Sequence, residues 1–375
     1  MLPLIAAAVL SSPLAAGASP DHLIQIGIMP FADEISIVIE GKYTVADAQV
    51  RPHELRARKR YRVEPRGTTG LALGSIDLGD EAKLVPDGKE DLIDIEGKRY
   101  PGALLFKRNP NGTVTAINEV GIEDYLRGVL PLEMDPDWPL EALKAQAVVA
   151  RTFAYTQMNK YRKAGFDLTA DTRSQVYGGV GDDSPTVRRA VEETRGEVLG
   201  YQGQILNVYY HACCGGHTAN AGAVWGGATP RPLMGVRDKY CDRSPLSKWT
   251  ATFTLDALKE ALARAHMPGG RLRRFEIGSK DLYGYVKTFI VKTGDRSRTV
   301  KASDLRKWLG NTSIKSVRIS RIKKSGSGVE FFGRGSGHGV GLCQWGARIQ
   351  AQDGRKYEKI LSFYFPGSTL SVIDE

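Results

Sequence analysis

Cysteine, histidine and long apolar segments are all scarce in this sequence. The 375 residues include 4 cysteines and 6 histidines. Beyond the N-terminus, no run approaches the ~18 consecutive apolar residues that a membrane-spanning helix needs. Internal repeats and low-complexity linkers are also absent. With 42% hydrophobic and 25% charged residues, the composition predicts an ordinary globular protein and argues against disorder.

Nucleotide-binding motifs are absent as well. The segment FFGRGSGHGVGLCQWGA has glycines on both sides of His338, but it contains no GxGxxG register and no GK[ST]. This disfavours a nucleotide ligand. Because glycines permit tight turns and the close approach of a ligand, His338 is a candidate donor to a sugar or a carboxylate. A purely structural turn system is the alternative.

The chain is basic, with 52 Lys and Arg against 42 Asp and Glu and a net charge of +10. Residues 1–18 carry no charge, so their removal would leave this excess unchanged. The excess favours a polyanionic partner, whether nucleic acid, an anionic membrane or a bacterial cell wall. Charge alone does not choose among them.

The N-terminus has the features of an export signal. An apolar run precedes Pro13, and Ala16-Gly17-Ala18 forms a small-x-small cleavage site. We therefore expect residues 1–18 to be a signal peptide and the protein to be secreted or located in the cell envelope. A short apolar strand or a membrane anchor is the alternative, because a basic n-region is missing.

Hydrophobic patterning divides the rest of the chain into two parts. Residues 19–120 show short apolar runs broken by Gly, Pro and Asp, which predicts a mainly β N-terminal part. At Pro139 helical spacing begins and predicts a central helix with Asp137 as its N-cap. Shorter helices and strands follow within residues 121–375, including a predicted α/β insertion at 251–325. The expected fold is α+β, with mixed and antiparallel strands framing a groove.

Glu133 is the first candidate for chemistry. It lies between Leu132 and Met134, with Trp138 close behind. A carboxyl in apolar surroundings has its charged form disfavoured by desolvation, so its pKa rises toward the range where it can protonate a leaving oxygen near neutral pH. Glycosidic cleavage needs such an acid. The alternative is a surface residue at a helix approach, where acidic side chains are favoured.

The segment HACCGGH is the second candidate. His211, Cys213, Cys214 and His217 lie within seven residues, a spacing that a zinc site can use although it matches no standard finger. The competing interpretation is a Cys214–Cys241 disulfide formed in an oxidising compartment, with His217 left as a donor in the site. Spacing alone leaves both interpretations open.

Five segments in the same order resemble one family. EDYLRGVLPLEM, WPLEALKAQAVVARTFAY, HACCGGHTANAGAVWGG, GRGSGHGVGLCQWGA and ILSFYFPGSTL are similar to segments of the SpoIID/LytB family of sporulation and autolysin-associated proteins. The resemblance extends from about Ile24 to the C-terminus. It implies a peptidoglycan lytic transglycosylase that cleaves the MurNAc-GlcNAc backbone of glycan strands and leaves 1,6-anhydro-MurNAc ends.

The resemblance also assigns roles to single residues. It places the catalytic glutamate at Glu133, which acts alone as general acid and base, so that no second carboxylate is required. It implies zinc near the CGG segment, with His211, Cys214 and His217 as the ligands. Other polar residues of the motifs would hold sugar and lactyl groups, namely Lys144, Gln146, Arg151, His338 and Gln344.

Two rival hypotheses follow from the same residues. The main rival is a non-catalytic protein that binds peptidoglycan and stimulates a cell-wall amidase. Another is a zinc hydrolase centred on His211, Cys214 and His217. The expected partners are peptidoglycan glycan strands and, for the first rival, an amidase; neither nucleic acid nor a nucleotide is expected.

Overall fold

The computed structural model describes residues 22–181, 184–264, 272–326 and 328–373. Helices and mostly antiparallel sheets make up these ranges, which confirms the predicted α+β class. The predicted signal peptide, residues 1–18, lies outside the described residues. Among the described residues, no helix combines the length and the apolar character that crossing a bilayer requires.

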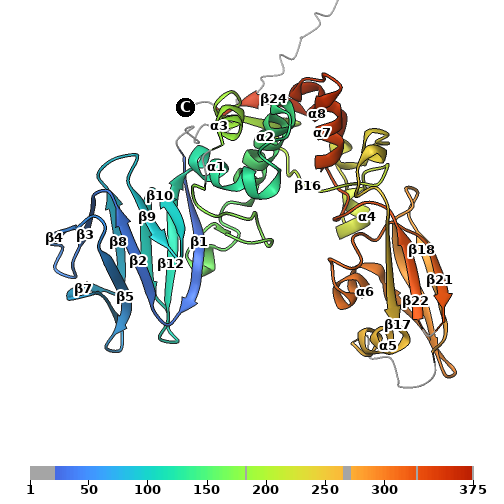
Figure 1. Cartoon of the computed structure of the whole chain (residues 1–375), viewed down its shortest axis with the longest axis horizontal. Coiled ribbons are helices and arrows are strands. Elements are labelled where there is room, and N and C mark those ends of the chain that lie inside the picture. Colours follow the sequence, from blue (N-terminus) through green and yellow to red (C-terminus); the bar gives the residue numbers. More distant parts are fainter. Residues whose placement is uncertain (1–21, 182–183, 265–271, 327, 374–375) are drawn as a thin grey trace, which may run out of the picture.

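The N-terminal part consists of two sheets at one end of the molecule (Figure 1). Their strands are β1 (Leu23–Ala32), β2 (Ile35–Glu40), β3 (Tyr43–Ala46), β4 (Pro52–Leu55), β5 (Arg60–Arg66), β6 (Gly70–Leu73), β7 (Ile76–Gly79), β8 (Glu81–Pro86), β9 (Leu92–Ile95), β10 (Lys98–Pro101), β11 (Ala103–Arg108), β12 (Val114–Gly121) and β13 (Leu168–Thr169). The strand orders are β13-β1-β12-β11-β8-β3-β4 and β10-β9-β2-β5-β6-β7. β1 pairs antiparallel with β12 and parallel with β13, so the chain returns to this sheet just before residues 172–176.

A group of helices follows these sheets (Figure 1). They are α1 (Ile122–Glu133), α2 (Leu140–Gln157), α3 (Pro185–Glu192), α7 (Gln344–Gln352) and α8 (Tyr357–Tyr364). α2 contacts each of the others, and 11 of its 18 residues are buried, so it is the core of this part. The predicted central helix is confirmed, but its predicted cap is wrong. Pro139 occupies the N-cap position, and Asp137 is exposed with its N–H bonded to Asp135.

Helix α1 was not predicted, because its sequence contains two poor helix formers. Pro131 lacks an N–H, but it lies near the end of the helix, where the break costs little. Gly128 is needed for packing, because a Cβ atom there would come within 2.5 Å of the Tyr177 ring. The helix ends at Glu133, since Met134 is extended.

Short elements connect the helices to the remaining sheets. They are η1 (Arg162–Ala164), β14 (Glu197–Tyr201), β15 (Gln204–Ile205), β16 (Tyr210–His211), α4 (Ala221–Trp225), η2 (Arg231–Leu233), η3 (Tyr240–Arg243), β23 (Leu342–Cys343) and β24 (Thr369–Val372). β14 and β15 form a hairpin, with Gly203 in its turn. β16 leaves this hairpin and pairs in parallel with β23. This pairing brings the HACCGG segment beside the glycine-rich loop.

Residues 249–333 form a separate β-rich region at the other end of the molecule (Figure 1). Its elements are β17 (Trp249–Thr254), α5 (Leu255–Ala263), β18 (Leu272–Lys280), β19 (Val286–Thr293), β20 (Arg296–Lys301), α6 (Ala302–Leu309), β21 (Ile319–Ser325) and β22 (Gly328–Gly333). Phe289, Val291 and Phe331 belong to its own hydrophobic core. The region overlaps the insertion predicted at 251–325. It holds 18 Lys and Arg against 7 Asp and Glu, a net charge of +11 that exceeds the +10 of the whole chain.

One buried ion pair joins α1 to α2. Arg151 is 0% exposed, and its Nε and Nη2 donate to the two carboxylate oxygens of Glu123 at 2.9 and 2.6 Å. Its Nη1 donates to the Glu197 carbonyl at 3.1 Å, which ties both helices to β14. A buried charge that has lost its partner is strongly destabilising, so the two side chains depend on each other.

We predict that Arg151→Met lowers the free energy of unfolding by about 3–5 kcal/mol, because the substitution leaves Glu123 buried and unpaired. Equilibrium urea unfolding measures the change. The exposed pair Arg243–Asp353 provides a matched control, in which Arg243→Met should cost less than about 1 kcal/mol. Equal costs for the two substitutions would contradict the structural role of Arg151.

Candidate functional site

Glu133 is the last residue of α1 and lines a pocket. Its Oε1 accepts a hydrogen bond from the backbone N–H of Val176 at 3.2 Å. Burial raises the pKa of Glu133, and it outweighs the opposite effect of the hydrogen bonds from Val176 and Tyr210. The negative end of the α1 dipole also disfavours the charged form. Glu133 therefore keeps its proton to a higher pH than an exposed glutamate would.

A chain of hydrogen bonds leads to the Glu133 carboxyl. The Tyr125 hydroxyl donates to Gln175 Oε1 at 3.2 Å, and Gln175 Nε2 donates to the Tyr210 hydroxyl oxygen at 3.3 Å. The Tyr210 hydroxyl is then free to donate to Glu133, with which it is hydrogen-bonded. These three side chains fix the position of the carboxyl and place a donor against it.

The pocket beside Glu133 has a volume of about 550 Å³. Glu133 is the sole acidic side chain among the described residues that line it. The other lining side chains are mainly aromatic and basic, including Phe153, Tyr209, Tyr210, Trp225, Lys160 and Arg173. Such a pocket has one proton donor, rings on which a sugar can stack, and cations that can hold a carboxylate.

His338 lines the same pocket from the glycine-rich loop. Its Nδ1 accepts the backbone N–H of Val340 at 3.1 Å, so the proton of the neutral ring lies on Nε2. Burial and the neighbouring His211 ring lower the pKa of His338 to about 3. His338 is therefore neutral at physiological pH, and its ring N–H is hydrogen-bonded to the backbone of Tyr210.

Trp225 and Tyr209 form an aromatic wall next to His338. The Trp225 ring is 4.4 Å from the Tyr209 ring and 5.2 Å from the His338 ring, measured between centroids. Trp225 is nevertheless 50% exposed. An exposed indole at the edge of a pocket is a suitable surface for a sugar ring.

Comparison with known proteins identifies the family. The family described as "SpoIID: Stage II sporulation protein" matches residues 110–201, which include Glu133 and Val176. An uncharacterized protein of Brachyspira hyodysenteriae is 38% identical over 286 residues, which is 76% of this chain and 75% of that one. This chain belongs to the SpoIID/LytB family.

Two SpoIID/LytB relatives from Bacillus subtilis have functional names. The amidase enhancer is 31% identical over 365 residues, and the match covers 81% of this chain but 50% of the enhancer's length. Stage II sporulation protein D is 29% identical over 324 residues, covering 81% of this chain and 88% of that protein. The chain is thus a member of a cell-wall-related sporulation protein family.

Three of the residues predicted to bind substrate lie elsewhere. Arg151 is engaged by Glu123 in the core, and Gln146 is also 0% exposed. Lys144 forms ion pairs with Glu141 and Glu193. The predictions for Lys144, Gln146 and Arg151 were wrong, because α2 is surrounded by the other helices and turns these side chains toward them rather than toward the pocket.

Gln344 has a different role from the predicted one. It is 6% exposed, and its Nε2 donates to the backbone carbonyl of Glu133 at 3.0 Å. Gln344 therefore holds the end of α1 and does not line the pocket. Of the five predicted substrate-binding residues, His338 lines the pocket, and its contact with substrate stays a prediction.

The predicted zinc ligands do not converge. The His211 Nδ1 lies 3.0 Å from the Val340 carbonyl oxygen. The His217 Nδ1 lies 2.7 Å from its neighbour's carbonyl oxygen, and its ring stacks on Tyr283 at 4.1 Å. Neither histidine joins Cys214 in a group with metal-binding spacing among the described residues. The ligand set His211, Cys214 and His217 was wrong, and the zinc-hydrolase hypothesis loses its site.

The alternative disulfide is not formed either, because Cys214 and Cys241 are both free in the structure. All four cysteines are buried. Cys214, Cys241 and Cys343 instead share a cluster with Asp238, a residue that the sequence did not single out.

Several pocket residues had escaped the sequence analysis. Tyr210 directly precedes the HACCGG segment, and Trp225 lies within the GAVWGG segment, so adjacency to a motif was a usable signal for both. Val176 acts through its backbone N–H, which no side-chain pattern reveals.

We predict that Glu133→Gln raises the free energy of unfolding at neutral pH, because it removes a carboxylate whose ionisation burial opposes. The folded-state pKa lies above the unfolded value. The stability contributed by the protonated carboxyl is therefore complete below the unfolded pKa and is lost as the pH rises through the folded pKa. The advantage of the variant should be absent in acid and should grow with pH.

Urea unfolding of wild type and Glu133→Gln over a pH series measures this trend. Asp135→Asn alters an exposed acid two residues away and is the matched control. A difference between wild type and Glu133→Gln that does not change with pH would show that burial does not govern the Glu133 carboxyl.

Proposed function

We propose that this SpoIID/LytB protein is a secreted lytic transglycosylase that cleaves the MurNAc-GlcNAc backbone of peptidoglycan, with Glu133 as general acid and then general base. The observation that carries the proposal is a single acidic side chain, with a raised pKa, among the described residues of an aromatic pocket. Hydrolysis of a glycosidic bond commonly uses two carboxyl groups. One protonates the leaving oxygen, and the other activates water or attacks the sugar, so a pocket with a single carboxyl favours transglycosylation.

The proposed reaction uses one carboxyl twice. Protonated Glu133 donates its proton to the glycosidic oxygen as the bond to the anomeric carbon breaks. The carboxylate then removes the proton of the 6-hydroxyl of the same muramic acid, whose oxygen closes on the anomeric carbon. No water enters, and the product has a 1,6-anhydro end. Glu133 is then protonated again and is ready to act on the next linkage.

Tyr210 would support both halves of this cycle. Its hydroxyl donates to Glu133 and stabilises the carboxylate formed after the first proton transfer. Burial opposes this stabilisation and outweighs it, so the pKa of Glu133 stays above its ordinary value. A pKa near the working pH is what a group that serves as both acid and base requires.

The other pocket side chains fit a glycan ligand. Trp225 and Tyr209 offer ring faces to a sugar, and the neutral ring of His338 lies beside Trp225. Lys160 lies on the lining and would attract the lactyl or stem-peptide carboxylate of muramic acid, whereas Arg173, also on the lining, is already paired with Asp171. The +11 charge of residues 249–333 would favour association with an anionic cell wall. An envelope or extracellular location agrees with such a substrate.

The decisive prediction concerns products. Purified protein incubated with intact and with amidase-stripped peptidoglycan should release 1,6-anhydro ends, detected by mass spectrometry. Glu133→Gln should reduce this release by at least about 10²-fold, because it removes the proton donor. Asp135→Asn, which changes an exposed acid nearby, should retain activity. Reducing ends instead of anhydro ends would contradict the mechanism.

The second candidate function is stimulation of a cell-wall amidase, favoured by the name of the amidase enhancer relative. The same peptidoglycan assay separates it from catalysis when a purified amidase is added. A stimulator would release no anhydro ends alone, and Glu133→Gln would stimulate the amidase as well as wild type. That pair of results would replace the transglycosylase proposal.

A further prediction concerns pH. Tyr210→Phe removes a donor to the charged form of Glu133, so the pKa of Glu133 should rise further. Because the first step needs protonated Glu133, the alkaline limb of kcat/KM should move to higher pH in the variant. The pH profile of anhydro-end formation measures this. An unmoved alkaline limb with reduced kcat would assign Tyr210 a merely structural role.

A further inference from the structure

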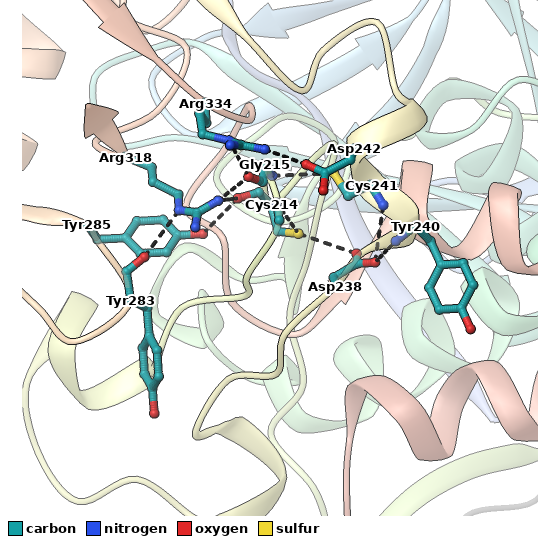
Figure 2. A network of polar contacts seen from close by, with 11 residues as sticks. Cys214, Gly215, Asp238, Tyr240, Cys241, Asp242, Tyr283, Tyr285, Arg318 and Arg334 are labelled. Carbon is teal, nitrogen blue, oxygen red and sulfur yellow. Dashed lines mark hydrogen bonds and ion pairs between the residues drawn. The ribbon is translucent and has the colours of Figure 1, made fainter. Parts of the chain in front are cut away.

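Three thiols and one carboxylate gather in the core near the pocket. The group is Cys214, Asp238, Cys241 and Cys343, whose ligand atoms all lie within 4.8 Å of one another. Each residue is at most 1% exposed. The ligands come from three chain segments, and Figure 2 shows the Cys214 sulfur turned toward the Asp238 carboxylate. Buried thiols are tolerated while they stay neutral, but the buried carboxylate of Asp238 is unfavourable unless something pairs with it.

Backbone N–H groups point at all three sulfur atoms. Cys214 Sγ accepts one such bond at 3.4 Å, Cys241 Sγ one at 3.3 Å, and Cys343 Sγ two at 3.3 and 3.4 Å. The donors are the N–H groups of Gly216, Gly215, Cys214 and Gly346. Hydrogen bonds to sulfur favour the thiolate, which is the form that binds a metal.

The carboxylate of Asp238 is held in place on both oxygens. Its Oδ2 lies 3.3 Å from Cys214 Sγ and accepts the Tyr364 hydroxyl at 2.8 Å. Its Oδ1 accepts the backbone N–H groups of Tyr240 and Cys241 at 3.0 and 3.2 Å (Figure 2). Hydrogen bonds of this kind orient the ligands of metal sites.

Positive charge lies next to the cluster. Arg318 Nη1 donates to the carbonyl of Gly215, and Arg334 Nε donates to the same carbonyl at 2.8 Å (Figure 2). Three thiolates and a carboxylate around a divalent ion carry a net charge of −2. Arg334 is also paired with Asp242, so Arg318 is the guanidinium that would offset part of that charge.

We propose that Cys214, Asp238, Cys241 and Cys343 form a structural zinc site with four protein ligands. Zinc prefers thiolate, imidazole and carboxylate ligands in a tetrahedron, and the sulfur–oxygen edge of such a tetrahedron is about 3.6 Å. The 3.3 Å separation of Cys214 Sγ and Asp238 Oδ2 is close to that value. Four protein ligands leave no open position, so the ion does not act on substrate.

This site differs from the one implied by the family resemblance, because both predicted histidines are replaced by Asp238 and distant cysteines. Cys343 lies 129 residues from Cys214, so the ion would cross-link separate parts of the chain. Gln344, which holds the Glu133 carbonyl, directly follows Cys343. Tyr210, which contacts Glu133, is on β16, the strand paired with Cys343. Zinc would therefore fix the segments that surround the pocket without entering it.

The metal content of the full chain tests the proposal independently of glycan cleavage. Purified protein should contain about one zinc per chain, and exchange for cobalt should give the sulfur-to-cobalt charge-transfer absorption and the visible bands of tetrahedral cobalt. Cys343→Ser should abolish both signals. Cys213→Ser is the comparison variant: Cys213 is buried and hydrogen-bonded to Cys241 and Cys343 but lies outside the group with metal-binding spacing, so its loss should leave both signals.

A second variant covers the case in which Cys343→Ser does not fold. Tyr364→Phe removes only the hydroxyl that orients Asp238, so zinc should still bind, with an affinity about 10- to 100-fold weaker. Metal-free protein with a mass lower by the hydrogens of a disulfide would overturn the proposal. So would cobalt bands that persist in Cys343→Ser and disappear in Cys213→Ser. Loss of zinc from a variant that still forms anhydro ends would leave the proposed catalysis intact.

Discussion

The proposed chemistry depends on the burial of one carboxyl group at the end of a helix. Glu133 ends α1 where its charge is disfavoured by desolvation and by the helix dipole, while the Val176 N–H and the Tyr210 hydroxyl stabilise its ionised form. Neither burial alone nor hydrogen bonding alone would give a carboxyl that can both donate and accept a proton. A fully dry carboxyl would not ionise, and a solvated one would not keep its proton.

The rest of the fold places this carboxyl and holds it there. The sheet that contains β1 and β13 leads into residues 172–176, and the pairing of β16 with β23 positions Tyr210 and the loop of His338; both segments line the pocket with Glu133. The Arg151–Glu123 pair fixes α1 against α2. These supports come from segments far apart in sequence, so the pocket exists only in the folded chain.

The sequence predicted those features that depend on local pattern or on a motif. Helical spacing revealed α2, and apolar neighbours together with the family motif singled out Glu133. His338 was identified through its glycine-rich loop, which does line the pocket. In each case the signal was carried by adjacent residues.

What the sequence did not predict depends on long-range packing. Lys144, Gln146 and Arg151 were assigned to the pocket as polar residues of the family motifs, but α2 is enclosed by other helices. The cluster around Cys214 uses Asp238 and Cys343, which lie 24 and 129 residues away and have no shared motif. Nothing in local spacing could distinguish them from His211 and His217.

The central claim is that burial raises the pKa of Glu133, so that its carboxyl keeps its proton to a higher pH than an exposed glutamate does. A carbon-13 NMR titration of protein labelled at the glutamate carboxyl carbons tests it most directly, with the Glu133 resonance assigned by its absence in Glu133→Gln. The account predicts a midpoint above that of the exposed glutamates in the same spectrum. A Glu133 midpoint equal to or below theirs would contradict it.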